Sequence, residues 1–383
     1  MQPDVKQLIL AAGPAGIAAD ALMEALQDQI SRSTLNRHLA SLRESGDIKP
    51  IGNARATRYV TTTPFTRADI DAYFAKPANS RPLAPFREEY LEAVPGIDPD
   101  RARRCAQIQA LANPIDRKYL AEFIVDFSWG SSVLEGSSYS ELDTEALVLY
   151  GERNPAKPVE DAVLALNHKR AGEYLWQHRE LNVENICEMQ ALLTDDHAMP
   201  EVLASDHFLP VEKRGKARVF EDVNLQNSAY LPPFRPGTSH AADMLKKIVE
   251  TAKSLAPLAP VEAAVYLLTR IAYVQSFANG NKRTSRLAAN IPLLAAGLIP
   301  FSFVDVNKAD YIRGMAAFYE LGSMHVIEQT FIQGYARSII RSSNLPAAMR
   351  VAGFDADALA QGLVEFINAG KRPADASVRS FLG

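Results

Sequence analysis

The chain has 383 residues, of which 47% are hydrophobic and 22% charged, and its formal net charge is −4. This length provides for two or three domains with substantial cores. The slightly negative charge argues against non-specific nucleic-acid binding by the whole chain, although one small module could still bind it.

Two further classes are disfavoured by composition. Cys105 and Cys187 are too few for a disulfide framework, and no Cys/His cluster has the spacing of metal ligands. No apolar run approaches the ~20 residues of a membrane span, and the start of the chain resembles no signal peptide. We therefore expect a cytoplasmic protein.

Residues 1–62 predict a small N-terminal domain of three short helices followed by a β-hairpin, with the third helix over 35–44. This pattern is similar to the winged helix-turn-helix class. If the domain binds DNA, the cations that would contact its grooves and phosphates are Arg32, Arg37, Arg43, Arg55 and Arg58. Seven Lys/Arg against six Asp/Glu give this module a charge of only +1, so a protein contact or dimerisation stays an alternative.

The rest of the chain predicts a linker, a long helical domain and a tail. Residues 63–84 combine a short helix with a proline-rich connection and are expected to be a linker. Residues 85–342 show helical periodicity almost throughout and predict a mainly α, all-α core, whereas the tail 343–383 contains one expected helix over 355–368. Helices of the core are expected over 86–94, 99–110, 114–128, 143–150, 158–177, 182–195, 239–254, 260–275, 282–297, 307–320 and 324–341.

The most informative stretch runs from Gln275 to Arg286, where a polar turn joins two helical patterns. Arg283 and Arg286 lie three apart, on one face of the outgoing helix. The helix dipole disfavours cations at the N-terminus of this helix, whereas the free backbone N–H groups there favour an anion. Because arginine forks match phosphate oxygens, the stretch predicts a polyphosphate site. The alternative is a tight turn whose arginines pair with acidic neighbours.

This stretch resembles the signature of the Fic/Doc family, His-x-Phe-x-(Asp/Glu)-Gly-Asn-(Gly/Lys)-Arg-x-x-Arg. The resemblance implies an all-α Fic-like core with a short β-hairpin flap, and transfer of AMP from ATP, with Mg²⁺, to a Ser, Thr or Tyr hydroxyl of a target protein. It also implies that Asn281 and the neighbouring backbone contact the α-phosphate, and that Arg286 contacts the γ-phosphate. Lys282 and Arg283 would contact the outer phosphates. The positions that fit in register are Phe277, Gly280, Asn281, Lys282, Arg283 and Arg286.

Two positions depart from the signature. Gln275 replaces the catalytic His, and glutamine cannot act as a general base, a role worth roughly 10²–10⁴-fold in rate. Asn279 replaces the magnesium-holding carboxylate, and it offers a hard cation only one neutral oxygen. We therefore expect an inactive or impaired adenylyltransferase. The alternative is a catalytically silent, nucleotide-sensing transcriptional regulator that acts through the winged helix.

A second stretch, Ser131 to Gly136, resembles the motif (Ser/Thr)-x-x-x-Glu-(Gly/Asn) with which some family members inhibit themselves. In those members the glutamate, here Glu135, pairs with the last arginine of the signature, here Arg286. A charge-assisted pair of this kind would compete with the γ-phosphate for one guanidinium. The alternative is a helix-end carboxylate in solvent.

A third stretch lies between residues 205 and 237, where the helical period is lost and 218–223 could form a strand. The segment Ser228, Ala229, Tyr230 and Leu231, followed by two prolines, matches the Tyr-x-Pro-Pro run at the flap of the family. The flap aligns the target by strand pairing; an ordinary surface hairpin is the alternative. The expected partners are thus ATP and a target protein with a hydroxyl side chain, with DNA and a second copy of the chain as further options.

Overall fold

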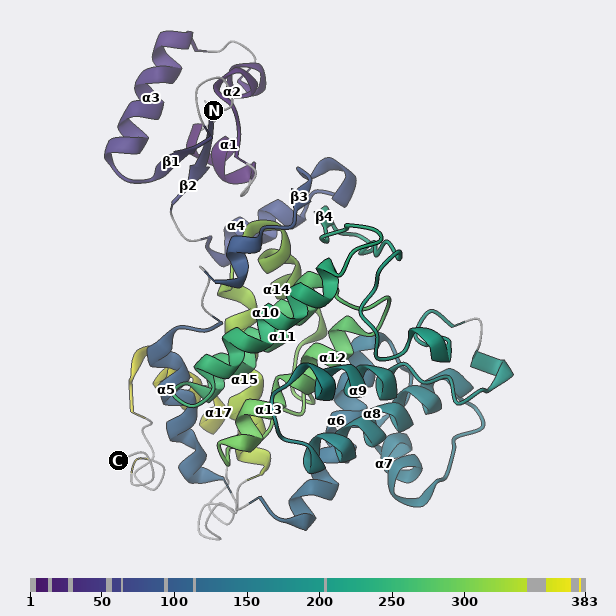
Figure 1. The fold of residues 1–383 in the computed structure, drawn as a ribbon. Coiled ribbons are helices and arrows are strands. Elements are labelled where there is room, and N and C mark those ends of the chain that lie inside the picture. Colours follow the sequence, from purple (N-terminus) through teal and green to yellow (C-terminus); the bar gives the residue numbers. More distant parts are fainter. Residues whose placement is uncertain are drawn as a thin grey trace. The chain divides into compact units, whose positions relative to one another are not determined.

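The fold is mainly helical, as the sequence predicts (Figure 1). The computed structural model describes residues 5–12, 16–26, 30–52, 57–62, 65–92, 96–112, 115–202, 205–342, 356–372 and 379. The chain divides into two units, one of residues 1–87, 224–232 and 312–327 and one of residues 88–223, 233–311 and 328–383. Among the described residues, no helix is both long and apolar enough to cross a membrane.

The first unit begins with three helices and two strands. They are α1 (Val5–Ala11), α2 (Ala19–Ala25), α3 (Arg32–Glu44), β1 (Ile48–Ile51) and β2 (Arg58–Thr61). The strands pair antiparallel, and Ser31 caps α3 by accepting from the backbone N–H of Thr34. Ile9, Leu22 and Leu35 are buried in the core of these elements. The class of the domain stays a prediction, and Arg55 lies outside the described residues.

The segment predicted as a linker contains one α-helix, as its sequence indicates. Thr66 and Asp69 form a capping box that starts α4 (Arg67–Phe74), and Ile70 packs against residues of α14 (Lys308–Leu321). Further along, Arg81 forms an ion pair of 2.9 Å with the carboxylate of Glu320, and both side chains are buried. The prolines of this segment thus lie beside a short helix with its own apolar contacts.

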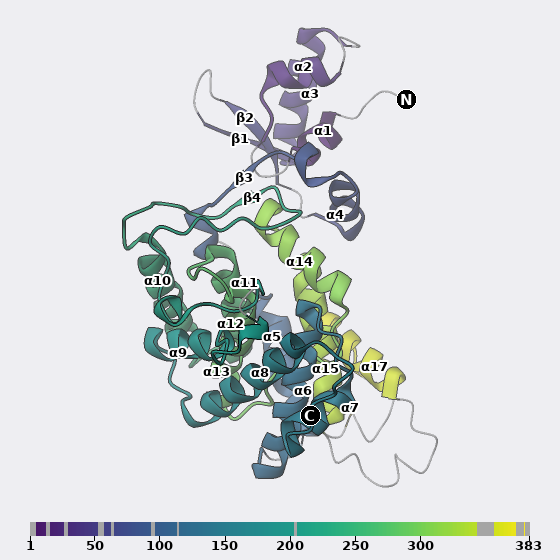
Figure 2. The same cartoon turned by 90° about the vertical axis from the view of Figure 1, so that its right-hand side faces the viewer.

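The second unit is a bundle of helices in which α11 is almost entirely buried. A helix that is apolar on all sides is typical of the centre of a helical domain. The helix α6 packs along α8, and the two lie side by side in both views (Figure 1, Figure 2). The helices are α5 (Pro99–Gln107), α6 (Arg117–Glu135), α7 (Glu141–Tyr150), α8 (Val159–Gln177), α9 (Val183–Leu193), α10 (His240–Leu255), α11 (Pro260–Val274), α12 (Asn281–Ala288), α13 (Asn290–Ala295), α15 (His325–Arg341) and α17 (Ala356–Ala369).

Three predicted helices differ from those in the structure. The helix predicted over 114–128 continues as α6 to Glu135, because only Gly136, with φ of 107°, ends it in the left-handed conformation. The helix predicted over 282–297 is divided into α12 and α13, because Pro292 lacks the N–H that a continuous helix would use. Only a 3₁₀ turn, at Glu88–Leu91, is present in the described part of 86–94.

The predicted strand over 218–223, and with it the predicted hairpin flap, is not formed in the described stretch 205–237. The carboxylate of Glu221 accepts from the N–H groups of Val219 and Phe220, which a strand ladder would need. The strand present there is β4 (Tyr230–Leu231), which pairs parallel with β3 (Ala84–Pro85). Pairing within the chain therefore occupies the edge of β4 on the side of β3.

Candidate functional site

The turn between α11 and α12 is fixed by its own side chains and backbone. Gln275 ends α11 with φ of 52°, and Gly280 precedes α12 with φ of 77°. Between them, the Asn281 amide accepts from the Phe277 N–H at 2.9 Å and donates to the Phe277 carbonyl at 2.8 Å. Phe277 itself is fully buried. The turn therefore has a single well-defined shape.

Gly280 is required for two physical reasons. Its positive φ is unfavourable for other residues, and a Cβ at this position would lie 2.6 Å from Cγ2 of Thr194. Gln190 of α9 also fixes this turn, because its Nε2 donates to the carbonyl of Asn279 at 3.0 Å. The N-terminus of α12 thus packs directly against α9.

This N-terminus has the features of an anion site. No side chain caps α12, and the N–H groups of a first helical turn have no partner within their helix. Lys282 is exposed there, whereas Asn281 is buried and supports the turn. The ammonium group of Lys282 and the backbone of the first turn are therefore available to a phosphate.

Arg283 does not match its predicted contact with the outer phosphates. Its side chain is buried, and its guanidinium donates to the carbonyl of Leu193 at 2.6 Å and to the carbonyl of His207. These bonds attach the loop after α9 to α12. In this conformation Arg283 therefore holds the loop after α9 in place against α12.

Arg286 has an acidic partner. Its guanidinium is fully buried, and Nη2 lies 2.5 Å from Oε1 of Glu135, at the end of α6. Its Nε donates to Oγ of Ser131 at 2.8 Å, and Nη1 lies 3.4 Å from the hydroxyl of Tyr311. Burial raises the pKa of Glu135, but the charges of Arg286, Arg283 and Lys282 outweigh this and lower it to about 2. The structure thus brings together two residues that are 151 positions apart.

Gln275, at the position of the family His, forms hydrogen bonds with both polar atoms of its side chain. Its Nε2 donates to the carbonyl of Ala272 at 2.6 Å, its Oε1 accepts from Asn281 at 2.9 Å, and it is only 3% exposed. Its own carbonyl accepts from Nε of Arg218 at 2.6 Å. An amide in this arrangement caps the end of α11 and has no capacity to take a proton.

Asn279, at the position of the family's magnesium-holding carboxylate, uses its amide in contacts within the chain. Its side-chain oxygen accepts from the N–H of Gly280, and its amide nitrogen donates to the carbonyl of Asp206. Within the described ranges, no group of three or more His, Cys, Asp or Glu residues could hold a metal ion. Both polar atoms of the Asn279 amide are therefore engaged by the chain itself.

The flap residues form a separate polar cluster within the first unit. Glu320 accepts from Oγ of Ser228 at 2.8 Å and from the N–H of Ala229 at 3.1 Å. Ala229 and Tyr230 are buried, whereas Leu231 is 46% exposed. The predicted target-docking segment is thus anchored to its own unit through most of its length.

The arginines predicted to contact DNA differ in their exposure and in their partners within the chain. Arg37 and Arg43 of α3 are exposed, and Nη2 of Arg37 lies 3.4 Å from Oγ1 of Thr34 in the same helix. Arg32 pairs with Asp20 at 2.5 Å, and Arg58 donates to the carbonyl of Gly16 at 3.0 Å. Two of the predicted cations therefore extend from α3 into solvent.

Three residues at the site were not predicted. Tyr311 approaches Arg286, and Arg218 joins the segment before the flap to Gln275. His168 of α8 is fully buried, with Nε2 2.8 Å from Oγ of Ser131. A lone histidine on a helix gives no signal in the sequence, because its partner becomes evident only when α6 and α8 pack.

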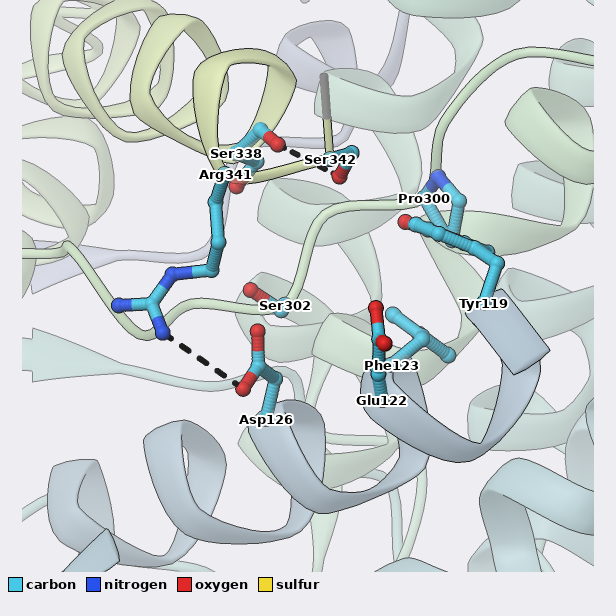
Figure 3. Close-up of a pocket in the computed structure, with 9 residues that line it drawn as sticks. All are labelled: Tyr119, Glu122, Phe123, Asp126, Pro300, Ser302, Ser338, Arg341 and Ser342. Carbon is cyan, nitrogen blue, oxygen red and sulfur yellow. Dashed lines mark hydrogen bonds and ion pairs between the residues drawn. The ribbon is translucent and has the colours of Figure 1, made fainter. Parts of the chain in front are cut away.

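A depression outside this site lies beside the first half of α6 (Figure 3). Arg341 of α15 extends into it and lies 3.8 Å from Asp126 and 3.4 Å from Glu141. Burial raises the pKa of Asp126 to about 6, although Arg341 opposes this. The depression contains an internal ion-pair cluster.

Comparisons with known proteins find similarity to a curated relative and to two solved structures. The protein adenylyltransferase fic-1 of Caenorhabditis elegans is 22% identical over 361 residues, which cover 88% of this chain and 63% of that relative, so this chain spans less than two thirds of it. The structure of Fic-1 from C. elegans covers 88% of this chain and 97% of its own, with 17% identity and a TM-score of 0.47. A Fic family protein from Desulfovibrio desulfuricans covers 71% and 87%, with 16% identity and a TM-score of 0.49.

The match to a family model is the most specific of these findings. The model of the Fic/DOC family matches residues 180–293, a segment that contains Gln275 to Arg286. Residues 180–293 of this chain therefore form a Fic/DOC family domain.

Proposed function

We propose that this chain is a Fic-type protein adenylyltransferase whose phosphate-binding half is retained and whose proton-transfer half is lost. The ion pair between Arg286 and Glu135 is the observation that carries this proposal. A fully buried guanidinium such as that of Arg286 is unfavourable unless an anion accompanies it. In this chain Glu135 supplies that anion, and in the proposed active state the γ-phosphate of ATP replaces it.

The proposed reaction transfers AMP to a hydroxyl oxygen of a protein. The oxygen forms a bond to the α-phosphorus, the bond to the β-phosphate breaks, and pyrophosphate leaves. The first turn of α12 and Lys282 would orient the phosphates, and Arg286 would bind the terminal one once Glu135 withdraws. The hydroxyl proton needs a base, which Gln275 does not provide. We therefore expect transfer by this chain to be absent or slow.

Magnesium is not assigned to a protein ligand in this proposal. The oxygen of Asn279 is already used by the N–H of Gly280, and an amide oxygen is a poorer ligand than a carboxylate for a hard cation. A magnesium ion that enters with the nucleotide would be bound by its phosphates.

Label transfer from α-³²P-ATP to protein tests the proposal. We expect no labelling by this chain and strong labelling by the double variant Gln275→His, Glu135→Gly, because a base is restored and the guanidinium is freed. The single variant Glu135→Gly serves as the matched control that lacks the base. If neither variant labels protein although both bind ATP, the transferase proposal is refuted and a nucleotide-sensing regulator is favoured.

We infer a second activity, DNA binding by the N-terminal domain, from the exposed arginines of α3. Arg37 and Arg43 extend into solvent on the helix that would enter the major groove of a winged helix-turn-helix complex. This activity is what the alternative function, a silent transcriptional regulator, would need. It also gives the N-terminal domain a role that AMP transfer does not.

Fluorescence anisotropy with duplex DNA at several salt concentrations tests this activity. Replacing Arg37 and Arg43 by Ala should weaken binding and reduce the salt slope by about 2, since each phosphate contact contributes about 0.9. Lys246→Ala, in an exposed pair on α10, is the control. Equal binding by the parent and the double variant would contradict the inference.

A further inference from the structure

The ion pair between Arg286 and Glu135 is supported by a histidine from a different helix. Ser131 lies one helical turn before Glu135 on α6, so both side chains lie on the same face. Together they contact two nitrogens of Arg286: Nε donates to Oγ of Ser131 at 2.8 Å, and Nη2 contacts Glu135 at 2.5 Å. His168 of α8 contacts the same hydroxyl from behind, at 2.8 Å.

The direction of these hydrogen bonds follows from what each group can donate. Arginine has no acceptor, so the Ser131 oxygen must accept from Nε of Arg286. The hydroxyl hydrogen of Ser131 is then free to point at Nε2 of His168, which accepts it when the ring is neutral. Nδ1 of His168 must carry a proton, because it donates to the carbonyl of Leu164 at 2.8 Å; Oγ of Ser132 lies 3.2 Å from the same nitrogen. The contacts thus define one neutral tautomer of His168.

The surroundings of His168 favour this neutral form. The ring is fully buried, and the edge of the Phe127 ring lies against it with a centroid separation of 5.7 Å. Burial, followed by the charges of Arg286 and Arg283, lowers the pKa of His168 to about 3. Glu135 is the carboxylate that faces this group, and its charge acts in the opposite direction. At neutral pH the ring therefore stays a hydrogen-bond acceptor.

We propose that His168 is a positioning residue that sets the strength of the inhibition by Glu135, an inference that rests on the proposed function. By accepting from Ser131, His168 directs the oxygen of that hydroxyl at Nε of Arg286. This orients the guanidinium toward Glu135 and away from an incoming γ-phosphate. Without the ring nitrogen, the hydroxyl of Ser131 can rotate, and Arg286 is attached to α6 through Glu135 and the Ser131 carbonyl.

The first test needs no variant and no nucleotide. NMR of ¹⁵N-labelled histidine should show His168 as the neutral Nδ1–H tautomer, unchanged down to pH 5. Titration near pH 6.5, or the opposite tautomer, would overturn the proposal whether or not the chain binds ATP.

The second test compares matched variants in the full chain. His168→Phe keeps a ring beside Phe127 but removes the acceptor, and we expect faster exchange of the Arg286 Nε–H proton. We also expect about fivefold tighter ATP binding, which corresponds to about 1 kcal/mol for one hydrogen bond. His168→Gln, which restores an acceptor, should return both values toward the parent. The matched control is His178→Phe, since His178 makes the same kind of contact, to the carbonyl four residues before it, that of Tyr174, at 3.0 Å. This variant should change neither value, because the contact to Ser131 comes from His168.

A cycle with Glu135→Gly separates regulation from general loosening. If His168 acts through the pair of Arg286 and Glu135, His168→Phe should not change ATP affinity once Glu135 is absent. An equal effect in both backgrounds, or unchanged Nε–H exchange in a folded His168→Phe variant, would overturn the proposal. If Nε–H exchange responds as expected but no variant binds ATP, the positioning by His168 is supported and the proposed function fails instead.

Discussion

Replacing Glu135 by Gln should destabilise the nucleotide-free protein, although it should also relieve the proposed inhibition. Arg286 is fully buried, and Glu135 is the carboxylate paired with it. The pKa of Glu135 is lowered from an ordinary value of 4.5 to about 2, and each pH unit corresponds to about 1.4 kcal/mol. The carboxylate thus contributes about 3 kcal/mol, which agrees with the roughly 3–5 kcal/mol lost when one partner of a buried pair is removed.

The pH dependence of this loss has a definite sign. A carboxyl group whose pKa is lowered by folding stabilises the protein above its unfolded pKa, and this contribution disappears as the pH falls through the folded value. The difference in unfolding free energy between the parent and Glu135→Gln should therefore be largest above about pH 5. It should shrink as the pH falls from about 4.5 to about 2.

Urea denaturation followed by circular dichroism measures this difference. The control is Glu122→Gln, on the same helix, whose partner Lys118 lies 3.9 Å away in an exposed pair, and which should change stability by less than about 0.5 kcal/mol. ATP at 100 times its dissociation constant should return about 2.7 kcal/mol to Glu135→Gln. Equal stability of Glu135→Gln and the parent at pH 7 would refute the account of the buried pair.

Three further predictions concern the stability of the fold. Gly280→Ala should lower the free energy of unfolding by more than about 1 kcal/mol in a thermal melt, because φ is positive and the new Cβ would lie 2.6 Å from Thr194; an unchanged melting temperature would contradict this. Glu320→Gln should cost about 3 kcal/mol in urea denaturation by leaving Arg81 buried and unpaired, and a loss below 1 kcal/mol would contradict it. Asp126→Asn should stabilise the protein by up to about 3 kcal/mol at pH 7, because burial raises the pKa of Asp126 and makes its ionisation unfavourable. This gain should vanish below about pH 4, and a loss of stability at pH 7 would contradict the prediction.

The sequence predicts the helical class and much of the site because these depend on local patterns. The turn signal at Asn279-Gly280 and the apolar run before it are local, and so is the motif that ends at Gly136. These patterns predict the α11–α12 turn, and the resemblance to the family supplies the partner of Glu135. The structure places that glutamate against Arg286.

What the sequence does not predict depends on individual side-chain contacts, most of which form between distant segments. Arg283 resembles a phosphate ligand by its spacing, but the loop that carries His207 supplies carbonyls to its guanidinium. The strand expected over 218–223 has suitable residues, yet Glu221 takes two of its N–H groups. His168 gains a partner only because α8 packs along α6. The contacts of Arg283 and His168 join distant segments, whereas those of Glu221 are local side-chain bonds to the backbone that compete with a strand.

The central claim is that Arg286 exchanges Glu135 for the γ-phosphate of ATP, and a crystal structure of Glu135→Gly with a non-hydrolysable ATP analogue tests it most directly. We predict phosphates at the first turn of α12, with a γ-phosphate oxygen about 2.8 Å from the Arg286 guanidinium. An analogue bound elsewhere, or bound at α12 with Arg286 still directed at Ser131 alone, would contradict the claim.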